Sequence, residues 1–227
     1  MGDYRLLPNS NVICMLDGRS FSSFVKNKFK KPFDDDFITM MNETAKYICK
    51  NVSGIKFAYV QSDEINILIN DLDNENTDPF FSYRVTKLIS IIASMATGKF
   101  NQLFDEYLIN GMNDVEEIKN AICNRKLLEF DCRVWNVPSY NDAYAWFIYR
   151  QNDCIRNSKQ QTCQTYLPNK QLLGLRTDAQ INILKEAKGI NWDDFEDGKK
   201  YGRLIVKQIK EFIREETGEK YMRGVWN

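Results

Sequence analysis

The sequence predicts an α+β fold, in which an antiparallel sheet with helices on one face is followed by a helical C-terminal extension. The prediction depends on three observations. Four segments before residue 138 carry the apolar runs or alternating patterns typical of strands. Two longer segments between them carry apolar residues at helical spacing. The 227 residues, 43% of them hydrophobic, suffice for one large domain or for one domain with an appended subdomain.

The first predicted strand leads into the first predicted helix. Residues 11–16 (NVICML) form a continuous apolar run that ends at Asp17 and Gly18, as in a buried strand. Residues 34–52 begin with three acidic side chains, which suit the N-terminus of a helix, and apolar residues then recur at helical spacing. The Ser-Gly pair that follows should end this helix.

The second and third predicted strands flank a short polar turn. Residues 55–61 are mostly apolar, and residues 64–70 alternate isoleucine with mostly polar side chains. The turn between them holds Ser62 and Asp63. Residues 71–79 form a polar loop that should lead to the next helix.

The second helix is expected at residues 81–100, where five apolar side chains form a stripe and Gly98 closes the helix. An acid-rich insert, residues 105–126, should hold a short helix. Residues 127–135 alternate apolar and charged side chains, which predicts the fourth strand.

This order of elements is the ferredoxin-like βαββαβ pattern. Right-handed crossovers leave one antiparallel strand between the members of each parallel pair, which gives the sheet order 4-1-3-2. The end of the first strand and the start of the third are then neighbours, about 4.8 Å apart. Asp17 and Asp63 should therefore meet at one edge of the sheet.

The pattern changes after the fourth strand. Helices are expected at residues 141–166 and 177–187, whereas residues 203–214 fit either a strand or a helix. We therefore expect one domain over residues 1–137 and a helical or mixed subdomain over residues 138–227 that packs on it.

The composition excludes several classes of protein. The chain has no histidine, which excludes Ser–His and Cys–His catalysis and imidazole zinc sites. Its six cysteines contain no C-x-x-C pair, which suits a reducing compartment, and we expect a cytoplasmic protein with the mitochondrion as the alternative. Basic and acidic residues balance at 31 each, so nucleic acid would need a local patch. We expect no signal peptide, transit peptide or membrane span.

Two carboxylates at adjacent strand ends form a hard oxygen site that suits Mg²⁺. Two such ions can activate an attacking oxygen and stabilise a leaving one, as in nucleotidyl transfer. Gly18 would let a phosphate or a metal approach the backbone closely. The competing interpretation is that Asp17 and Asp63 are ordinary turn residues. Glu64 should point to the opposite face from Asp63, so we expect it to support the site rather than to bind metal.

Two groups of cations are candidates for a triphosphate. Lys31 lies in the lysine-rich segment KNKFKKPF, shortly after Asp17. Arg84 and Lys87 are three residues apart and so lie on one side of a predicted helix. The alternative is that all three are ordinary surface cations.

The long helix after residue 140 carries a polar stripe. Arg150, Asp153 and Asn157 lie on one face, with Arg156 and Lys159 beside them. Asparagine and serine are poor choices for a long exposed helix, so the stripe favours a binding surface for nucleotide or RNA over a plain solvated face.

Several of these segments occur together, and in the same order, in one family. The sequence resembles the tRNA-histidine guanylyltransferase family, whose members are 3′–5′ RNA polymerases, and its tail resembles the Thg1-like branch. The resemblance lies in LDGRSF (16–21), KP (31–32) with Asp34 nearby, AYVQSDE (58–64), YRVTKLIS (83–90), FDCRVWNVP (130–138), YRQNDCIRN (149–157), GINWDDF (189–195) and KKYGR (199–203).

The resemblance implies a polymerase-type palm over residues 1–137. It implies two Mg²⁺ ions bound by the catalytic residues Asp17 and Asp63 and by the carbonyl of Gly18. Arg133, within one matching stretch, joins the helical stripe as a candidate for binding RNA or nucleotide. The residues implied to contact nucleotide are Gly18, Arg19, Ser20, Phe21, Lys31, Asp34, Ser62, Arg84 and Lys87.

The resemblance also implies the reaction. A tRNA 5′-monophosphate is activated with ATP and releases pyrophosphate. The 3′-hydroxyl of GTP or another NTP then attacks the activated end and expels AMP, and a 5′-triphosphate end skips activation. Members commonly form homotetramers whose tRNA contacts span subunits.

The sequence departs from the guanylyltransferase pattern in places. Ser22 and Ser23 stand where His-Arg is usual, Met15 stands where arginine is frequent, and residues 155–159 lack the usual His-Asn-rich motif. These differences favour template-dependent repair of 5′-truncated tRNA over addition of one guanylate to tRNA-histidine. A nucleotide cyclase and a non-catalytic RNA-binding module are further alternatives, but the sequence has no cyclase-type tip before the third strand and keeps both candidate metal acids.

Overall fold

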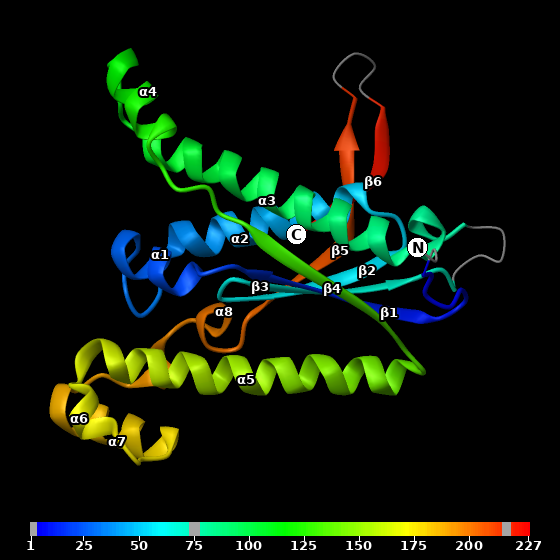
Figure 1. The fold of residues 1–227 in the computed structure, drawn as a ribbon. Coiled ribbons are helices and arrows are strands. Elements are labelled where there is room, and N and C mark those ends of the chain that lie inside the picture. The colour runs from blue at the N-terminus through cyan, green and yellow to red at the C-terminus, as the bar shows by residue number, and fades with distance from the viewer. Residues whose placement is uncertain (1–3, 73–77, 215–218) are drawn as a thin grey trace.

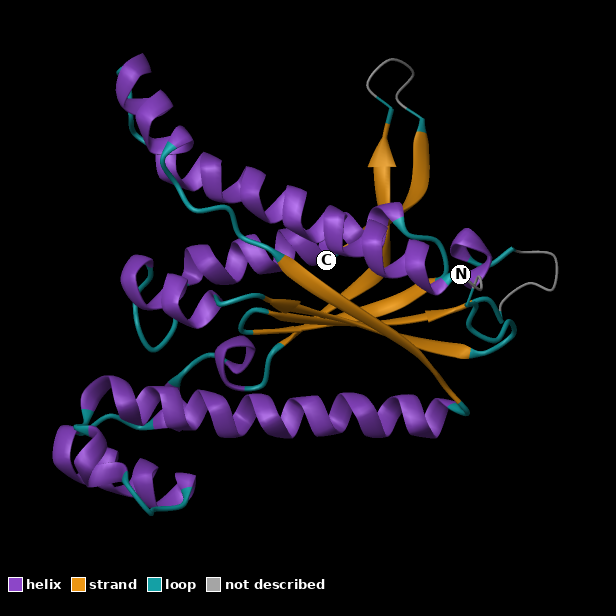
Figure 2. Cartoon of the chain, viewed as in Figure 1, coloured by secondary structure: helices purple, strands orange, loops and turns teal. Residues whose placement is uncertain are grey.

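The computed structural model describes residues 4–72, 78–214 and 219–227, and Figures 1 and 2 show them as one sheet between two helical layers. Of the polar loop expected at 71–79, residues 73–77 lie outside the described residues. None of the described helices is long and apolar enough to cross a membrane.

The sheet has six strands in the order β4-β1-β3-β2-β5-β6, and each neighbouring pair is antiparallel. The first four strands have the predicted order 4-1-3-2, which confirms the α+β class and the antiparallel sheet. Residues 203–213 form a strand rather than a helix, so the sheet continues into the C-terminal part of the chain. The strands are β1 (Asn11–Gly18), β2 (Ile55–Gln61), β3 (Glu64–Asn70), β4 (Phe130–Val137), β5 (Arg203–Ile213) and β6 (Lys220–Trp226).

Both long helices predicted before residue 130 and the two predicted after residue 140 are present. Shorter helical segments connect them to the strands. The helices are α1 (Phe21–Lys28), α2 (Asp35–Asn51), the 3₁₀ helix η1 (Phe80–Tyr83), α3 (Val85–Ile109), α4 (Val115–Cys123), α5 (Tyr140–Tyr166), α6 (Asn169–Leu172), α7 (Thr177–Lys188), the 3₁₀ helix η2 (Trp192–Asp194) and α8 (Asp197–Lys200).

Alternate side chains of the sheet pack against different helices. Cys14 and Ile67 face the main core, which lies under α2 and α3. Ile13 and Leu68 face the other side, where they pack with Ala143 of α5. Figure 2 shows α5 running along that face, so the sheet is covered on both sides, by α2 and α3 on one and by α5 on the other.

The helix that was predicted to close at Gly98 instead continues to Ile109. Phe100 and Phe104, in the following turn, are 0% and 1% exposed in the main core. One glycine in a helix interior costs only about 0.5–1 kcal/mol, whereas burying one phenylalanine contributes about 1.5–3 kcal/mol. Packing therefore overrides the local signal for a helix end.

Residues 21–28 form a helix that the sequence did not predict. The ring of Phe21 at its start packs in the aromatic core, with its centroid 5.0 Å from that of Phe130. A Cβ added to Gly18 would lie 2.6 Å from the Phe21 ring, so this contact requires glycine at that position. The packing thereby fixes the end of β1 that carries Asp17.

Strand β4 begins at Phe130, not at residue 127. The side chain of Asn101 on α3 binds both the N–H and the carbonyl of Leu128. Its oxygen accepts from the Leu128 N–H at 3.1 Å, and its amide donates to the Leu128 carbonyl at 2.7 Å. These bonds take the place of a strand ladder there.

Candidate active site

Asp17 and Asp63 come from neighbouring central strands and lie at the same edge of the sheet. Asp17, near the end of β1, is directly opposite Glu64 on β3 and Asp131 on β4. The backbone N–H of Gly18 donates to the carbonyl of Asp63 at 3.1 Å. The two acids, 46 residues apart in the sequence, are therefore joined by backbone pairing next to the β2–β3 turn.

Both carboxyl groups have raised pKa values. Burial raises the pKa of Asp63 to about 6, and the negative charges of Asp17 and Glu64 add to this effect. Burial also raises the pKa of Asp17, and the charges of Glu64 and Asp131 again add to it. The edge of the sheet thus concentrates negative charge in a partly desolvated place.

A divalent cation would offset this charge, so the residues present fit Mg²⁺. In the part of the chain that the structure describes, no three Asp, Glu, Cys or His side chains converge to enclose a metal. Mg²⁺ does not require such a cage, because it usually binds through one or two carboxylates and keeps water and substrate phosphates as its other ligands. Asp17, Asp63 and the Gly18 carbonyl would be the protein's share of such a site.

A cavity of about 190 Å³ opens beside Asp63, between α2 and α5. Its lining combines apolar groups with polar and charged ones, and Phe33 and Phe37 supply aromatic surface. A second cavity of about 270 Å³ shares Ser62, Asp63 and Asn157 with the first. The two hollows therefore meet at the carboxylate edge of the sheet.

Several predicted nucleotide contacts lie around these cavities. Lys31 and Phe21 line the second cavity, Asp34 lines the first, and Ser62 lines both. Phe21 is only 1% exposed, so its ring offers little surface to a ligand. Ser62 has a positive φ of 45°, which gives the β2–β3 turn its tight shape.

Asp34 also caps helix α2. Its carboxylate accepts from the Phe37 N–H at 2.9 Å and from the Lys30 N–H at 2.9 Å. The first bond is an N-cap interaction, which satisfies a backbone donor that the helix leaves free. Asp34 thus anchors the loop that carries Lys31 to the start of α2.

Arg19 and Ser20 lie beside the β1 edge but line neither cavity. Arg19 pairs with Glu129 at 2.8 Å, and both side chains are largely exposed. Ser20 has a positive φ of 59° at the start of α1. Their side chains are therefore outside the hollow next to Asp63.

Arg84 and Lys87 lie at the opposite end of the sheet within one chain. Tyr83, next to Arg84, bonds to Asp71 at 3.3 Å, just past the far end of β3. Asp63 precedes the near end of this seven-residue strand, and a rise of about 3.4 Å from each residue to the next separates its first and last residues by roughly 20 Å. Lys87 stands over the ring of Phe81 at 5.4 Å. A single chain does not bring these two cations to the carboxylates.

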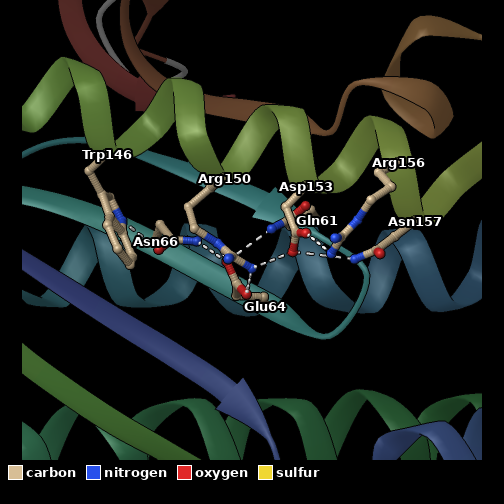
Figure 3. A network of polar contacts seen from close by, with 8 residues as sticks. All are labelled: Gln61, Glu64, Asn66, Trp146, Arg150, Asp153, Arg156 and Asn157. Atoms are coloured by element: carbon tan, nitrogen blue, oxygen red, sulfur yellow. Dashed lines mark hydrogen bonds and ion pairs between the residues drawn. The ribbon is translucent and has the colours of Figure 1, made fainter.

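The polar stripe of α5 is tied to the sheet by a network of charged groups (Figure 3). Arg150 donates from Nε to Glu64 at 2.8 Å and pairs with Asp153 at 3.2 Å. Asp153 in turn pairs with Arg156 and accepts from Asn157 at 3.4 Å. Arg150 and Asp153 are therefore engaged within the protein, whereas Asn157 reaches both cavities.

Glu64 is buried among donors rather than directed to solvent. Gln61 and Asn66 donate to the same carboxylate that Arg150 binds. The indole N–H of Trp146 donates to Asn66 at 3.0 Å, which extends the network along α5 (Figure 3).

The remaining two candidate cations lie beside the site. Lys159 binds Asp178 at 2.6 Å and stands 5.1 Å from the ring of Trp192. Arg133 pairs with Asp131 at 3.2 Å on β4, where its charge opposes the rise in the pKa of Asp17.

The sequence did not single out several residues that line the cavities. Gln160, Gln161 and Gln164 continue the stripe of Asn157 at helical spacing, so that spacing was a usable signal. Arg203, the last residue of the matching stretch KKYGR, enters the first cavity from β5, and the sequence analysis assigned it no role.

Residues 2–138 match the family model for tRNAHis guanylyltransferase. A probable tRNA(His) guanylyltransferase of Dictyostelium discoideum is 27% identical over 224 residues, which cover 94% of this chain and 81% of that protein. An uncharacterised protein of Acanthamoeba polyphaga mimivirus is also 27% identical, with coverage of 91% and 73%. The solved structure of a bacterial tRNA(His) guanylyltransferase (Thg1)-like protein in complex with ATP has a TM-score of 0.82 at 32% identity, covering 99% of this chain and 85% of that one.

Proposed function

Because this chain belongs to the tRNAHis guanylyltransferase (Thg1) family of nucleotidyltransferases, we propose that it is a Mg²⁺-dependent 3′–5′ nucleotidyltransferase acting on tRNA 5′ ends. The observation that carries the proposal is the meeting of Asp17 and Asp63 at one edge of the sheet, where Asp63 lines two cavities. Bacterial relatives of known structure bind ATP and GTP, which supports nucleoside triphosphates as substrates. We further propose that the first four strands act as a polymerase-type palm.

Asp17, Asp63 and the Gly18 carbonyl would hold two Mg²⁺ ions. When bound, such ions neutralise phosphate charge and lower the pKa of an attacking hydroxyl. Lys31 would contact phosphate oxygens from the second cavity, and Ser62 and Asn157 would orient the nucleotide where the cavities meet. Arg84 and Lys87 would reach a triphosphate only from another subunit or from another part of the substrate.

The reaction has two transfers. In the first, a phosphate oxygen of the tRNA 5′ end attacks the α-phosphorus of ATP, and pyrophosphate leaves. In the second, the 3′-hydroxyl of an NTP attacks the activated 5′ phosphorus, and AMP leaves. The site's task is to align the two reacting phosphates at the carboxylate edge, since positioning and charge neutralisation supply most of the catalysis in phosphoryl transfer.

We propose template-dependent repair of 5′-truncated tRNA as the main activity. The wall that α5 presents to the second cavity carries Gln160, Gln161 and Gln164. Amide side chains both donate and accept, so this wall favours no single base, and pairing with the opposite RNA strand would choose the nucleotide. Ser22 in the same cavity replaces the usual histidine.

The alternative is addition of one guanylate to tRNA-histidine, and the described activity of several relatives favours it. One assay separates the two. The protein is incubated with Mg²⁺, ATP and all four NTPs, and with either a 5′-shortened, 5′-monophosphorylated tRNA or tRNA-histidine that lacks the extra guanylate. Product lengths are then read on a sequencing gel.

Repair predicts that the shortened tRNA is extended to full length, with each added base complementary to the 3′ strand. A single guanylate added only to tRNA-histidine would establish the alternative. RNA binding without any extension would point to a non-catalytic module, and cyclic nucleotide formed from ATP or GTP alone would indicate a cyclase.

Three broader proposals accompany this function. Residues 1–137 would be the catalytic domain, with residues 138–227 as a subdomain packed on it. The active form would be a homotetramer, and the compartment the cytoplasm. Light scattering of the purified protein, with and without tRNA, tests the oligomer.

A further inference from the structure

Arg203 is a buried cation with an unused donor. Its Nη2 nitrogen is fully buried and has no hydrogen-bond partner within the residues that the structure describes. Burial lowers the pKa of its guanidinium, and the nearest ionisable groups, Cys154 and Tyr59, carry no charge at neutral pH. An unsatisfied buried donor of this kind usually marks a water, an ion or a ligand that binds there.

The local fold holds Arg203 in place. Gly202 has a φ of +80°, and a Cβ on it would lie 2.5 Å from the hydroxyl oxygen of Tyr59, so the chain can turn into β5 here only through glycine. Arg203 then donates from Nε to Asn42 on α2 at 2.8 Å and from Nη1 to the Gly198 carbonyl at 3.1 Å. Two of its nitrogens are thus fixed, and the guanidinium plane with them.

The charge of Arg203 is not compensated as its neighbours' charges are. Three other cations line the same cavity, and two of them have carboxylate partners. Arg150 pairs with Glu64 and Asp153. Lys199 pairs with Asp35 at 2.7 Å. Arg203 forms no ion pair with a carboxylate in the described part of the chain. The remaining cation, Lys30, is exposed to solvent, so Arg203 is the buried cation of this cavity that is left to serve a ligand.

The cavity leads from Arg203 to Asp63. Strand β5 pairs with β2 only as far as Val60, opposite Arg203. Beyond that point the edge of the β2–β3 turn borders the cavity of about 190 Å³. Phe33 and Phe37 line this hollow, so its surface suits a flat, partly apolar group.

We propose that Arg203 donates a hydrogen bond from Nη2 to an acceptor on the nucleobase of a nucleoside triphosphate bound in this cavity. The inference rests on the proposed function, because it needs the phosphates to lie at Asp17 and Asp63. Phe33 and Phe37 in the cavity wall offer flat apolar surface, which favours the base over the phosphates. Lys31, in the second cavity, is better placed for the phosphates.

The test compares Arg203→Met and Arg203→Lys with the unaltered chain in equilibrium binding by calorimetry, with Mg²⁺ present. The ligands are ATP, GTP and inorganic tripolyphosphate, which has phosphates but no base. Arg203→Met should weaken ATP or GTP binding by about 10-fold or more, as expected for loss of a hydrogen bond from a charged donor, and should leave tripolyphosphate binding unchanged. Arg203→Lys should give a smaller loss for the nucleotides.

Lys210→Met is the matched control, because Lys210 is an exposed cation on the same strand. It should leave binding of all three ligands unchanged. Thermal unfolding of each variant checks the fold, and Arg203→Lys keeps the test decisive if Arg203→Met does not fold. An equal loss of tripolyphosphate affinity would show that Arg203 contacts the phosphates. Unchanged nucleotide affinity would show that Nη2 does not bind the nucleotide. Either result overturns the proposal.

The two proposals fail in different ways. If the unaltered chain binds ATP through Arg203 but does not extend tRNA, the proposed function fails and the role of Arg203 stands. If the chain extends tRNA and Arg203→Met binds ATP as tightly as before, the role of Arg203 fails alone.

Discussion

At the scale of single residues, the site depends on two acids whose burial is costly without a cation. The pKa of Asp63 is raised to about 6 by burial and by nearby negative charge. Side chains placed only for folding would gain from being neutral here. Their meeting at the edge of the sheet, where Asp63 lines both cavities, therefore favours a role in binding a charged ligand.

We expect Asp17→Asn and Asp63→Asn each to lower tRNA 5′ extension by at least about 100-fold, because each variant removes charge that would hold Mg²⁺ at the reacting phosphates. The melting temperature measured without Mg²⁺ should not fall, since each change relieves the repulsion between neighbouring carboxylates. Gel assays of activation and addition measure the loss. Glu186→Gln, on the exposed side of α7, is the control and should keep full activity; full extension activity in either active-site variant would contradict the assignment.

Gly18 is a second residue of the site, and the neighbouring Phe21 ring leaves no room there for a side chain. Gly18→Ala would place a methyl group 2.6 Å from the Phe21 ring, and such overpacking should destabilise the fold by about 1–3 kcal/mol. Urea unfolding measures this. Stability equal to that of the unaltered chain would mean that Phe21 does not press on the end of β1.

At the scale of elements, Gly98 in helix α3 offers a comparison with Gly18, because there a side chain has room. Gly98 lies inside this helix, and a Cβ added to it would meet nothing within 4 Å. Gly98→Ala should therefore stabilise the protein by about 0.5–1 kcal/mol, because alanine loses less backbone entropy in a helix. The same urea experiment measures it, and a destabilised variant would argue that the helix breaks at residue 98 after all.

Helix α5 is held on the sheet by a buried ion pair. Glu64 and Arg150 have side chains only 9% and 13% exposed. Arg150→Met leaves an unpaired buried carboxylate and should destabilise the protein by about 3–5 kcal/mol. Denaturant unfolding measures the change in free energy.

A double variant, Glu64→Gln with Arg150→Met, supplies the control for that pair. It should be clearly more stable than Arg150→Met alone, because the uncompensated charge is gone. Additive losses would mean that the two side chains do not act as a pair.

At the scale of the whole molecule, helical layers lie on both faces of the sheet (Figure 1), and the edge that carries Asp17 and Asp63 lies within this framework. A ligand that binds only the folded chain raises its stability, by about 2.7 kcal/mol at 100 times its dissociation constant. We therefore expect Mg²⁺ with ATP to raise the melting temperature of the unaltered chain, and EDTA to reverse the rise. Asp63→Asn should show a much smaller shift in the same scan, and an equal shift would place the metal elsewhere.

The sequence alone predicted the strand–helix order, the 4-1-3-2 sheet and the meeting of Asp17 with the β2–β3 turn. It could do so because local periodicity identifies the elements, and the handedness of crossovers leaves few ways to join them. Its family motifs likewise predicted the guanylyltransferase family, since those segments occur along the chain in the order that the family has them.

Only the tertiary structure decided which other residues reach the cavities. It placed Arg84 and Lys87 at the far end of the sheet, carried α3 through Gly98, and brought Arg203 from β5 to the cavity beside Asp63. These outcomes depend on packing between segments far apart in the sequence. Spacing within a segment does not encode such contacts, so they became visible only when the chain was folded.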